Sequence, residues 1–207
     1  MDALDTELPW PKYFGKRNAS EYSGKTFTTG DTLLARITPC TENGKAAFVP
    51  EMETAVGIGS TEYAVLSPKT ERIQPWFLYY LGRSYPVHNY AVSRMRGSTG
   101  RQRIPFSVFR RELDVALPPL PEQRKIATVL HTVDRAIEQT NEIIEQIKRL
   151  KLGVSQHYFE DYDTVRREEN PESVDMVELS ELVEFKPGKA WKTDSLSEEG
   201  LRIVRIS

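Results

Sequence analysis

Apolar residues recur along residues 117–159 at alternating steps of three and four, a spacing that places them on one side of a helix. Three prolines come just before, and Pro121 followed by Glu122 is typical of a first helical turn. From Glu122 to about Tyr158 the predicted helix is roughly 55 Å long. We expect so long a helix to link two bodies and to pair with another helix. Its apolar seam consists of Ile126, Leu130, Val133, Ile137, Ile144, Ile147 and Val154.

The seam is interrupted at two positions. Thr140 and Lys151 occupy steps of the repeat where an apolar side chain is expected. The seam can therefore be buried against a partner, but not uniformly along its length.

Shorter patterns precede the long helix. Alternating or continuous apolar residues predict strands at 33–37, 46–49, 61–68 and 113–118. The Asn-Gly pair within 42–45 favours a tight turn between the first two strands. A dense apolar pattern after Pro75 predicts a shorter helix. Mixed strands and helices indicate an α+β domain over residues 1–118, followed by a long coiled-coil-forming spacer helix at 119–159.

The chain changes character after the spacer helix. Residues 160–175 are acidic and weakly patterned, which is typical of a linker. Residues 176–207 contain a predicted short helix, a turn at Pro187-Gly188 and a strand at 201–206. We expect this last segment to open another domain.

Composition narrows the classes of protein. The chain has 207 residues, of which 39% are hydrophobic and 28% charged. It has no run of about 18 apolar residues and no signal-peptide pattern, so neither a membrane span nor a signal peptide is indicated. The single cysteine, Cys40, excludes an internal disulfide and fits a reducing compartment. We expect a cytoplasmic location.

The net charge of -2 conceals a strong separation of charge along the chain. Between Gly82 and Arg111 there are seven arginines and no acidic residue. Between Glu160 and Glu184 there are ten acidic residues and two arginines. Because binding depends on the local field, the arginine-rich stretch is a candidate surface for a polyanion.

Phosphate binding is the chemistry that this stretch favours. Glycines at 97 and 100 let a loop approach a phosphate backbone, and arginines pair with phosphate or with guanine edges. The alternative is a solvated cationic loop, or arginines paired with the acidic linker. The candidate DNA-binding residues are Arg94, Arg96, Ser98, Thr99, Arg101, Gln102 and Arg103, with Arg36 and Lys45.

No catalytic constellation stands out. His88, His131 and His157 lack the spacing of metal ligands, and no phosphate-cradling motif ending in GK[ST] is found. No cofactor loop accompanies a methyltransferase motif. We therefore expect no metal, no cofactor and no catalysis by this chain alone.

Four stretches resemble a known family. VALPPLPEQRKIATVLHTVDRAIEQ (115–139) strongly resembles the conserved region of specificity subunits of type I restriction-modification systems, where a proline-rich start opens the spacer helix. Residues 30–49 and 97–109 resemble parts of their target recognition domains, and residues 177–189 resemble the opening of such a domain.

The resemblance implies a non-enzymatic reader of DNA. Subunits of this family carry two recognition domains, each binding half of a bipartite site, separated by antiparallel helices. The implied partners are double-stranded DNA, modification subunits that hold S-adenosylmethionine and, through these, ATP-dependent restriction subunits. A homodimer, or pairing with another specificity polypeptide, is expected as well.

The chain departs from the family in its length, because a full specificity subunit is much longer than 207 residues. We expect the recognition domain at 1–118 to be incomplete at its start. In a swapped homodimer, the segment at 176–207 would complete the recognition domain of the partner. Two alternatives remain: a fragment of a fused restriction and methylation enzyme, or an inactive dimerising fragment that binds modification subunits only.

Overall fold

A computed structural model of the chain describes residues 1–16, 23–98, 100–169 and 177–184, with the backbone alone for 160–169. Contacts divide the chain into two compact units, Met1–Ile147 and Lys148–Ser207. The predicted strand at 201–206 lies outside the described residues.

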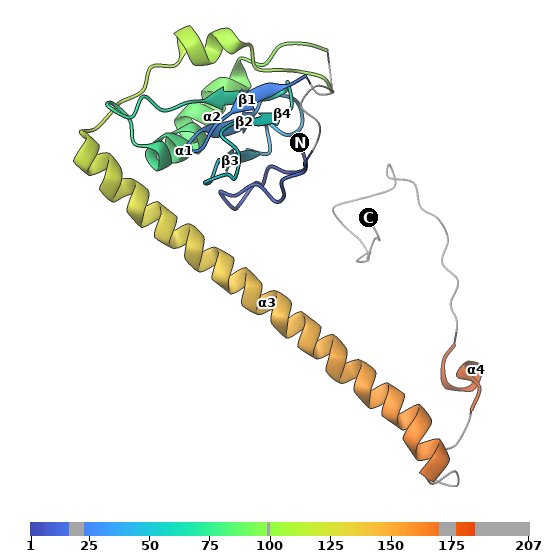
Figure 1. Cartoon of the computed structure of the whole chain (residues 1–207). Coiled ribbons are helices and arrows are strands. Elements are labelled where there is room, and N and C mark those ends of the chain that lie inside the picture. Colours follow the sequence, from blue (N-terminus) through green and yellow to red (C-terminus); the bar gives the residue numbers. More distant parts are fainter. Residues whose placement is uncertain (17–22, 99, 170–176, 185–207) are drawn as a thin grey trace, which may run out of the picture. The chain divides into compact units, whose positions relative to one another are not determined.

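An antiparallel sheet in the order β3-β2-β5 lies at the centre of the first unit (Figure 1). Its strands are β2 (Thr32–Ala35), β3 (Ala46–Phe48) and β5 (Tyr63–Leu66). Leu33 of the middle strand is paired with Ala47 on one edge and with Val65 on the other. Every residue of β2 is buried, as its apolar sequence predicted. Gly44, with φ of 69°, provides the predicted turn before β3.

A second, two-stranded sheet pairs β1 (Lys25–Phe27) with β4 (Gly57–Gly59) in antiparallel fashion. The Phe27 ring lies against the backbone of β4. A Cβ at Gly57 would be 2.2 Å from this ring, so the close approach requires glycine there. The ring thereby joins the hydrophobic core that includes Leu4 and Leu33.

Two helices pack beside the central sheet, and α1 contacts β2 and β3 (Figure 1). They are α1 (Pro75–Arg83) and α2 (Tyr85–Ser93), each with a proline in its first turn. Gln74 caps α1, because its side-chain oxygen accepts the Phe77 backbone N–H at 2.6 Å. Tyr79 is fully buried, and burial raises the pKa of its hydroxyl to about 12.

A long helix, α3 (Leu120–Glu169), follows, and Figure 1 shows it as one uninterrupted element. It confirms the predicted spacer helix and extends it by ten residues beyond 159, so it occupies most of the predicted linker. A short helix, α4 (Leu179–Leu182), lies where the sequence predicted one. Within the described residues, no helix combines the length and apolar character needed to cross a membrane.

One predicted strand is wrong. Residues 113–118 have no regular secondary structure and no strand partner. Their alternating pattern suggested a strand, but Val115 and Leu117 are exposed, at 44% and 41%. Before this segment, Val108–Glu112 forms a single π-helical turn, η2, whose Val108 is buried.

Candidate nucleic-acid interface

The arginine-rich loop is a small hairpin, here called the 96–103 hairpin. The backbones of Arg96 and Arg103 exchange two hydrogen bonds, of 2.9 and 2.8 Å. Gly97 has φ of 130°, and a Cβ there would be 2.9 Å from the Arg101 carbonyl oxygen, so the turn requires glycine. Arg96 and Arg103 thus close the predicted glycine-containing loop at its base.

The base of the hairpin is fastened to the segment that leaves β2. The Thr38 N–H donates to the Gln102 carbonyl at 3.0 Å, and the Ile104 N–H donates to the Arg36 carbonyl at 2.9 Å. Ile104 is 2% exposed and anchors the returning chain in the core. The hairpin is therefore held at its base, while Ser98, Gly100 and Arg101 are exposed.

Glu62 organises two of the predicted cations. Its carboxylate accepts the Nε–H of Arg103 at 2.8 and 3.0 Å and forms an ion pair with Nη2 at 2.8 Å. Hydrogen bonding from Arg103 holds the pKa of Glu62 below its ordinary value, although partial burial opposes this shift. The same hydrogen bond raises the pKa of Arg103. Arg103 therefore braces the hairpin within the domain.

Arg36 lies in the same network. Its Nε–H donates to the Ile104 carbonyl at 3.0 Å, and its guanidinium lies 4.0 Å from the centre of the Phe106 ring. Burial lowers the pKa of Arg36, while the charge of Glu62 raises it. Lys25 of β1 lies over the same ring at 4.9 Å. The network thus gathers cations from β1, the end of β2 and the hairpin.

Sequence reasoning missed Glu62, Phe106 and Lys25. Arg103 and Glu62 are 41 positions apart, so no local motif joins them. The only signal was that the resemblance over 97–109 included Phe106. Glu62 and Phe106 contact Arg103 and Arg36, and so fix these two arginines within the domain.

The remaining predicted arginines differ in their contacts. Arg94 lies over the Tyr90 ring, donates to the Tyr90 hydroxyl at 3.2 Å and is 4.0 Å from a Glu112 carboxylate oxygen. Arg96 and Arg101 are exposed, and no hydrogen-bond or ion-pair partner for their guanidinium groups is found among the described residues. Thr99, also predicted, lies outside the described residues. The cations of the hairpin that are exposed to solvent are therefore Arg96 and Arg101.

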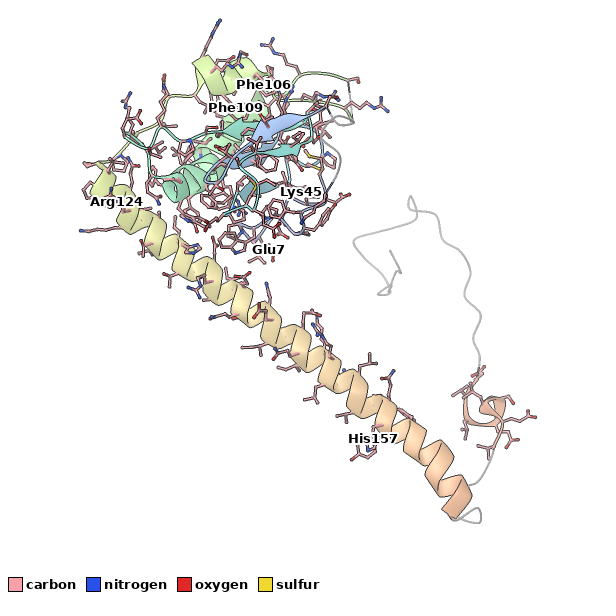
Figure 2. The ribbon with its side chains drawn as sticks, in the orientation of Figure 1. Glu7, Lys45, Phe106, Phe109, Arg124 and His157 are labelled. Carbon is pink, nitrogen blue, oxygen red and sulfur yellow. The ribbon has the colours of Figure 1, made fainter. Side chains whose placement is uncertain are left out.

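The backbone carbonyl of Lys45 accepts the Ala35 N–H at 3.0 Å, next to Arg36, but its side chain is not part of the arginine network. It lines a cavity of about 230 Å³ with Glu42 and His88, and none of the predicted arginines lines that cavity. In Figure 2, Lys45 lies well apart from Phe106, the ring that Arg36 covers. The His88 Nε2 is 2.7 Å from the Thr41 carbonyl oxygen, so this ring braces the turn before β3.

The start of α3 is fastened to the domain by a row of residues, here called the docked stripe: Gln123, Ala127, His131 and Asp134. Gln123 is 1% exposed; its side-chain oxygen accepts the Gln74 N–H at 2.9 Å. Its amide donates to the carbonyls of Arg72 and Pro118 at 3.1 and 2.8 Å. Gln123 of the stripe thus supplies hydrogen-bond partners to three backbone groups near the start of α1 and α3.

The C-terminal part of the docked stripe, His131 and Asp134, contacts aromatic residues of α1. The His131 ring centre is 4.2 Å from that of Trp76, and the Tyr80 hydroxyl donates to Asp134 Oδ2 at 2.7 Å. Burial raises the pKa of Tyr80, and the bond to Asp134 raises it further. The hydroxyl therefore keeps its proton and holds the carboxylate at neutral pH.

The predicted seam is exposed. It continues the line of Gln123 and lies beside Ala127, His131 and Asp134 on the neighbouring side of α3. Its residues are at least 37% accessible to solvent: Ile126, Leu130, Val133, Ile137, Ile144, Ile147 and Val154. Among the described residues, no group of three or more His, Cys, Asp or Glu side chains is placed to hold a metal ion. The described surfaces are thus a cationic hairpin and an apolar helix face.

Comparison with known proteins identifies the family. A family model described as "Type I restriction modification DNA specificity domain" matches residues 9–149. The chain belongs to this family. The Type I restriction enzyme EcoAI specificity subunit of Escherichia coli is 36% identical over 100 residues, which are 48% of this chain and 17% of that protein. The family resemblance found in the sequence is thus confirmed.

A more distant relative of the specificity domain family matches more of the chain. The Type I restriction enzyme MjaVIII specificity subunit of Methanocaldococcus jannaschii is 26% identical over 157 residues, which are 72% of this chain and 36% of that protein. The chain thus matches well under half of the length of each of these relatives.

Solved structures of type I systems confirm the predicted fold of an α+β domain with a long helix. The crystal structure of the HsdS subunit from Thermoanaerobacter tengcongensis has a TM-score of 0.50 at 24% identity, covering 84% of this chain and 43% of that chain. A chain from a study of complex assembly and conformational transition in the type I R-M system has a TM-score of 0.52 at 22% identity.

Proposed function

We propose that this specificity domain reads one half of a bipartite site in double-stranded DNA, as part of a type I specificity subunit. The observation that carries the proposal is the 96–103 hairpin, which presents Arg96 and Arg101 while Glu62 holds its base through Arg103. Exposed arginines beside glycines suit phosphate oxygens, and the flanking Ser98 and Gln102 add polar groups. Family membership supports the same function.

The partners follow from that assignment. We propose that the chain is a non-enzymatic, cytoplasmic subunit that directs modification subunits and, through them, restriction subunits to the site. The exposed seam of α3 is the surface proposed for pairing with another helix. The proposed parts remain a recognition domain at 1–118, a spacer from 119, and a last segment at 176–207 that completes another domain.

A salt titration of DNA binding tests the proposed contact surface. The double variant R96A/R101A should bind a mixed-sequence duplex about tenfold more weakly, with the slope of log affinity against log salt reduced by about two, because two phosphate contacts are lost. The matched control is R149A, which removes an exposed arginine from α3.

Two results would count against this surface. Unchanged affinity and salt slope in R96A/R101A would remove the hairpin from the interface. Absence of DNA binding by the unaltered chain, with helix pairing intact, would favour the inactive dimerising fragment. Circular dichroism checks that each variant is folded.

A further inference from the structure

Three segments of the chain meet at the ring of Phe106, beside the base of the 96–103 hairpin. The Lys25 ammonium of β1 lies 4.9 Å from the ring centre, and the Arg36 guanidinium, which follows β2, lies 4.0 Å from it. The ring itself packs against the hydrophobic core that contains Leu34 and Tyr79. Phe106 is therefore held in place, and it keeps two cations close to one point.

The charges around this ring are not balanced. Lys25 and Arg36 are both close to the same ring centre, so their charges are at most about 9 Å apart, which is comparable with the Debye length at physiological salt. The Glu62 carboxylate forms its ion pair with Arg103, and no ion pair between Glu62 and Arg36 is found among the described side chains. Three cations around one carboxylate therefore leave an excess of positive charge.

Both cations on the ring keep unused hydrogen-bond donors. The Nε–H of Arg36 donates to the Ile104 carbonyl at 3.0 Å, which leaves its two terminal nitrogens. For these nitrogens and for the exposed Lys25 ammonium, no hydrogen-bond or ion-pair partner is found in the part of the chain that the structure describes. A guanidinium and an ammonium that face one place suit an anion with several oxygens, and phosphate is such an anion.

The position of this cation pair favours phosphate that belongs to DNA. The Arg36 carbonyl accepts the Ile104 N–H at 2.9 Å, and Ile104 follows directly on the hairpin. The pair therefore lies at the foot of the hairpin that presents Arg96 and Arg101. Because a duplex carries its phosphates in closely spaced rows, a hairpin on the duplex brings other phosphates to nearby parts of the domain.

We propose that Lys25 and Arg36, positioned by the ring of Phe106, bind one backbone phosphate of double-stranded DNA outside the hairpin. The inference rests on the proposed function and adds a contact that the arginine-rich stretch alone does not contain. A phosphate contact carries no sequence information, but it fixes the orientation of a protein on the duplex. The cation pair therefore positions the hairpin against the DNA.

Substitution of Lys25 tests this site. K25Q should bind a mixed-sequence duplex about three- to tenfold more weakly, and the slope of log affinity against log salt should fall by about one, because one phosphate contact is lost. K25R keeps the charge and should keep the slope. The matched control is K69Q, which removes an exposed lysine from the loop after β5 and should leave affinity and slope unchanged.

A combined variant separates this site from the hairpin. In K25Q/R96A/R101A the slope should fall by about three, because contacts at separate sites add. If R96A/R101A lowers the slope and K25Q does not, this inference is wrong and the proposed function stands. If K25Q lowers the slope and R96A/R101A does not, the hairpin is wrong and the cation pair stands. Absence of DNA binding by the unaltered chain would overturn both.

The positioning role of Phe106 has its own test. In an F106L background, K25Q should weaken DNA binding less than it does in the unaltered chain, because the ring no longer holds the ammonium in place. A loss caused only by general damage to the fold would leave the effect of K25Q the same in both backgrounds. Equal effects would therefore overturn the role of the ring.

Free phosphate is the other source of the same chemistry. Thermal unfolding of the unaltered chain and of K25Q is compared in inorganic phosphate and in chloride at matched ionic strength. If K25Q abolishes stabilisation by phosphate but leaves DNA binding unchanged, the cation pair binds a free anion and the assignment to DNA is wrong. Weaker DNA binding by K25Q, with K69Q unchanged, supports the proposal. The same measurement checks that each variant is folded.

Discussion

Single residues divide the predicted cations into two groups. Glu62 binds Arg103 and attracts Arg36, whereas Arg96 and Arg101 have no such partner among the described residues. From sequence, all these arginines looked alike, because their types and spacing carry no information on a carboxylate 41 positions away. The sequence therefore predicted the cationic surface but not its internal bracing.

The shifted pKa of Glu62 gives a prediction about acid. Hydrogen bonding from Arg103 lowers the pKa in the fold below the ordinary 4.5, so the bond contributes fully to stability above pH 4.5. The contribution is lost as pH falls through the folded-state pKa. Denaturation of E62Q and the unaltered chain should therefore differ at neutral pH and converge in acid.

A matched control separates this bond from a general effect of charge. Glu51 is exposed, and E51Q should leave the free energy of unfolding unchanged at both ends of the pH range. If E62Q and the unaltered chain differed equally at neutral and acid pH, the bond to Arg103 would not be the cause.

At the scale of elements, period and turn chemistry predicted the central sheet, α1 and α3, but not β1, β4 or α2. The buried strands, the helix after Pro75 and the start of α3 lie close to their predicted positions. The strand at 113–118 failed because alternation alone does not supply a neighbour with which to pair. The end of α3 was placed too early, because the acidic residues after 159 suggested a linker.

The late end of α3 has a simple physical reason. Glutamate and arginine are strong helix formers, and acidic composition alone does not end a helix. The first proline after Pro121 is Pro171, two residues beyond Glu169, the last residue described for α3. A proline two residues later is typical of a helix end.

The joint between α3 and the domain depends on one glutamine. Q123L would leave the Gln74 N–H and the carbonyls of Arg72 and Pro118 without their partner, which should cost about 2–4 kcal/mol of unfolding free energy. Chemical denaturation measures this loss, and hydrogen exchange of the Gln74 amide should become faster.

The control for this joint is on the same helix. Gln139 is exposed, and Q139L should change the free energy of unfolding by about 0.5 kcal/mol or less. Equal effects of Q123L and Q139L would show that the buried bonds do not hold the helix to the domain.

At the scale of the molecule, the start of α3 lies in the same compact unit as the sheets and shorter helices before it. That unit comprises Met1–Ile147. The docked stripe ties the first four turns of α3 to α1 and its neighbours. Only tertiary contacts show it, since Gln123 and Asp134 look like ordinary polar helix residues in the sequence.

The separation of the docked stripe from the seam limits how the length of α3 can change. Each inserted residue turns everything beyond it by about 100°, whereas seven residues return it to within about 20° and add about 10.5 Å. Duplication of residues 138–144 in one chain should therefore preserve dimerisation in sedimentation, and a single alanine inserted after Glu138 should abolish it. Equal association of both would contradict this. Whole heptads keep the two faces of the helix in their relative orientation. The length of α3 can therefore vary in evolution by whole heptads.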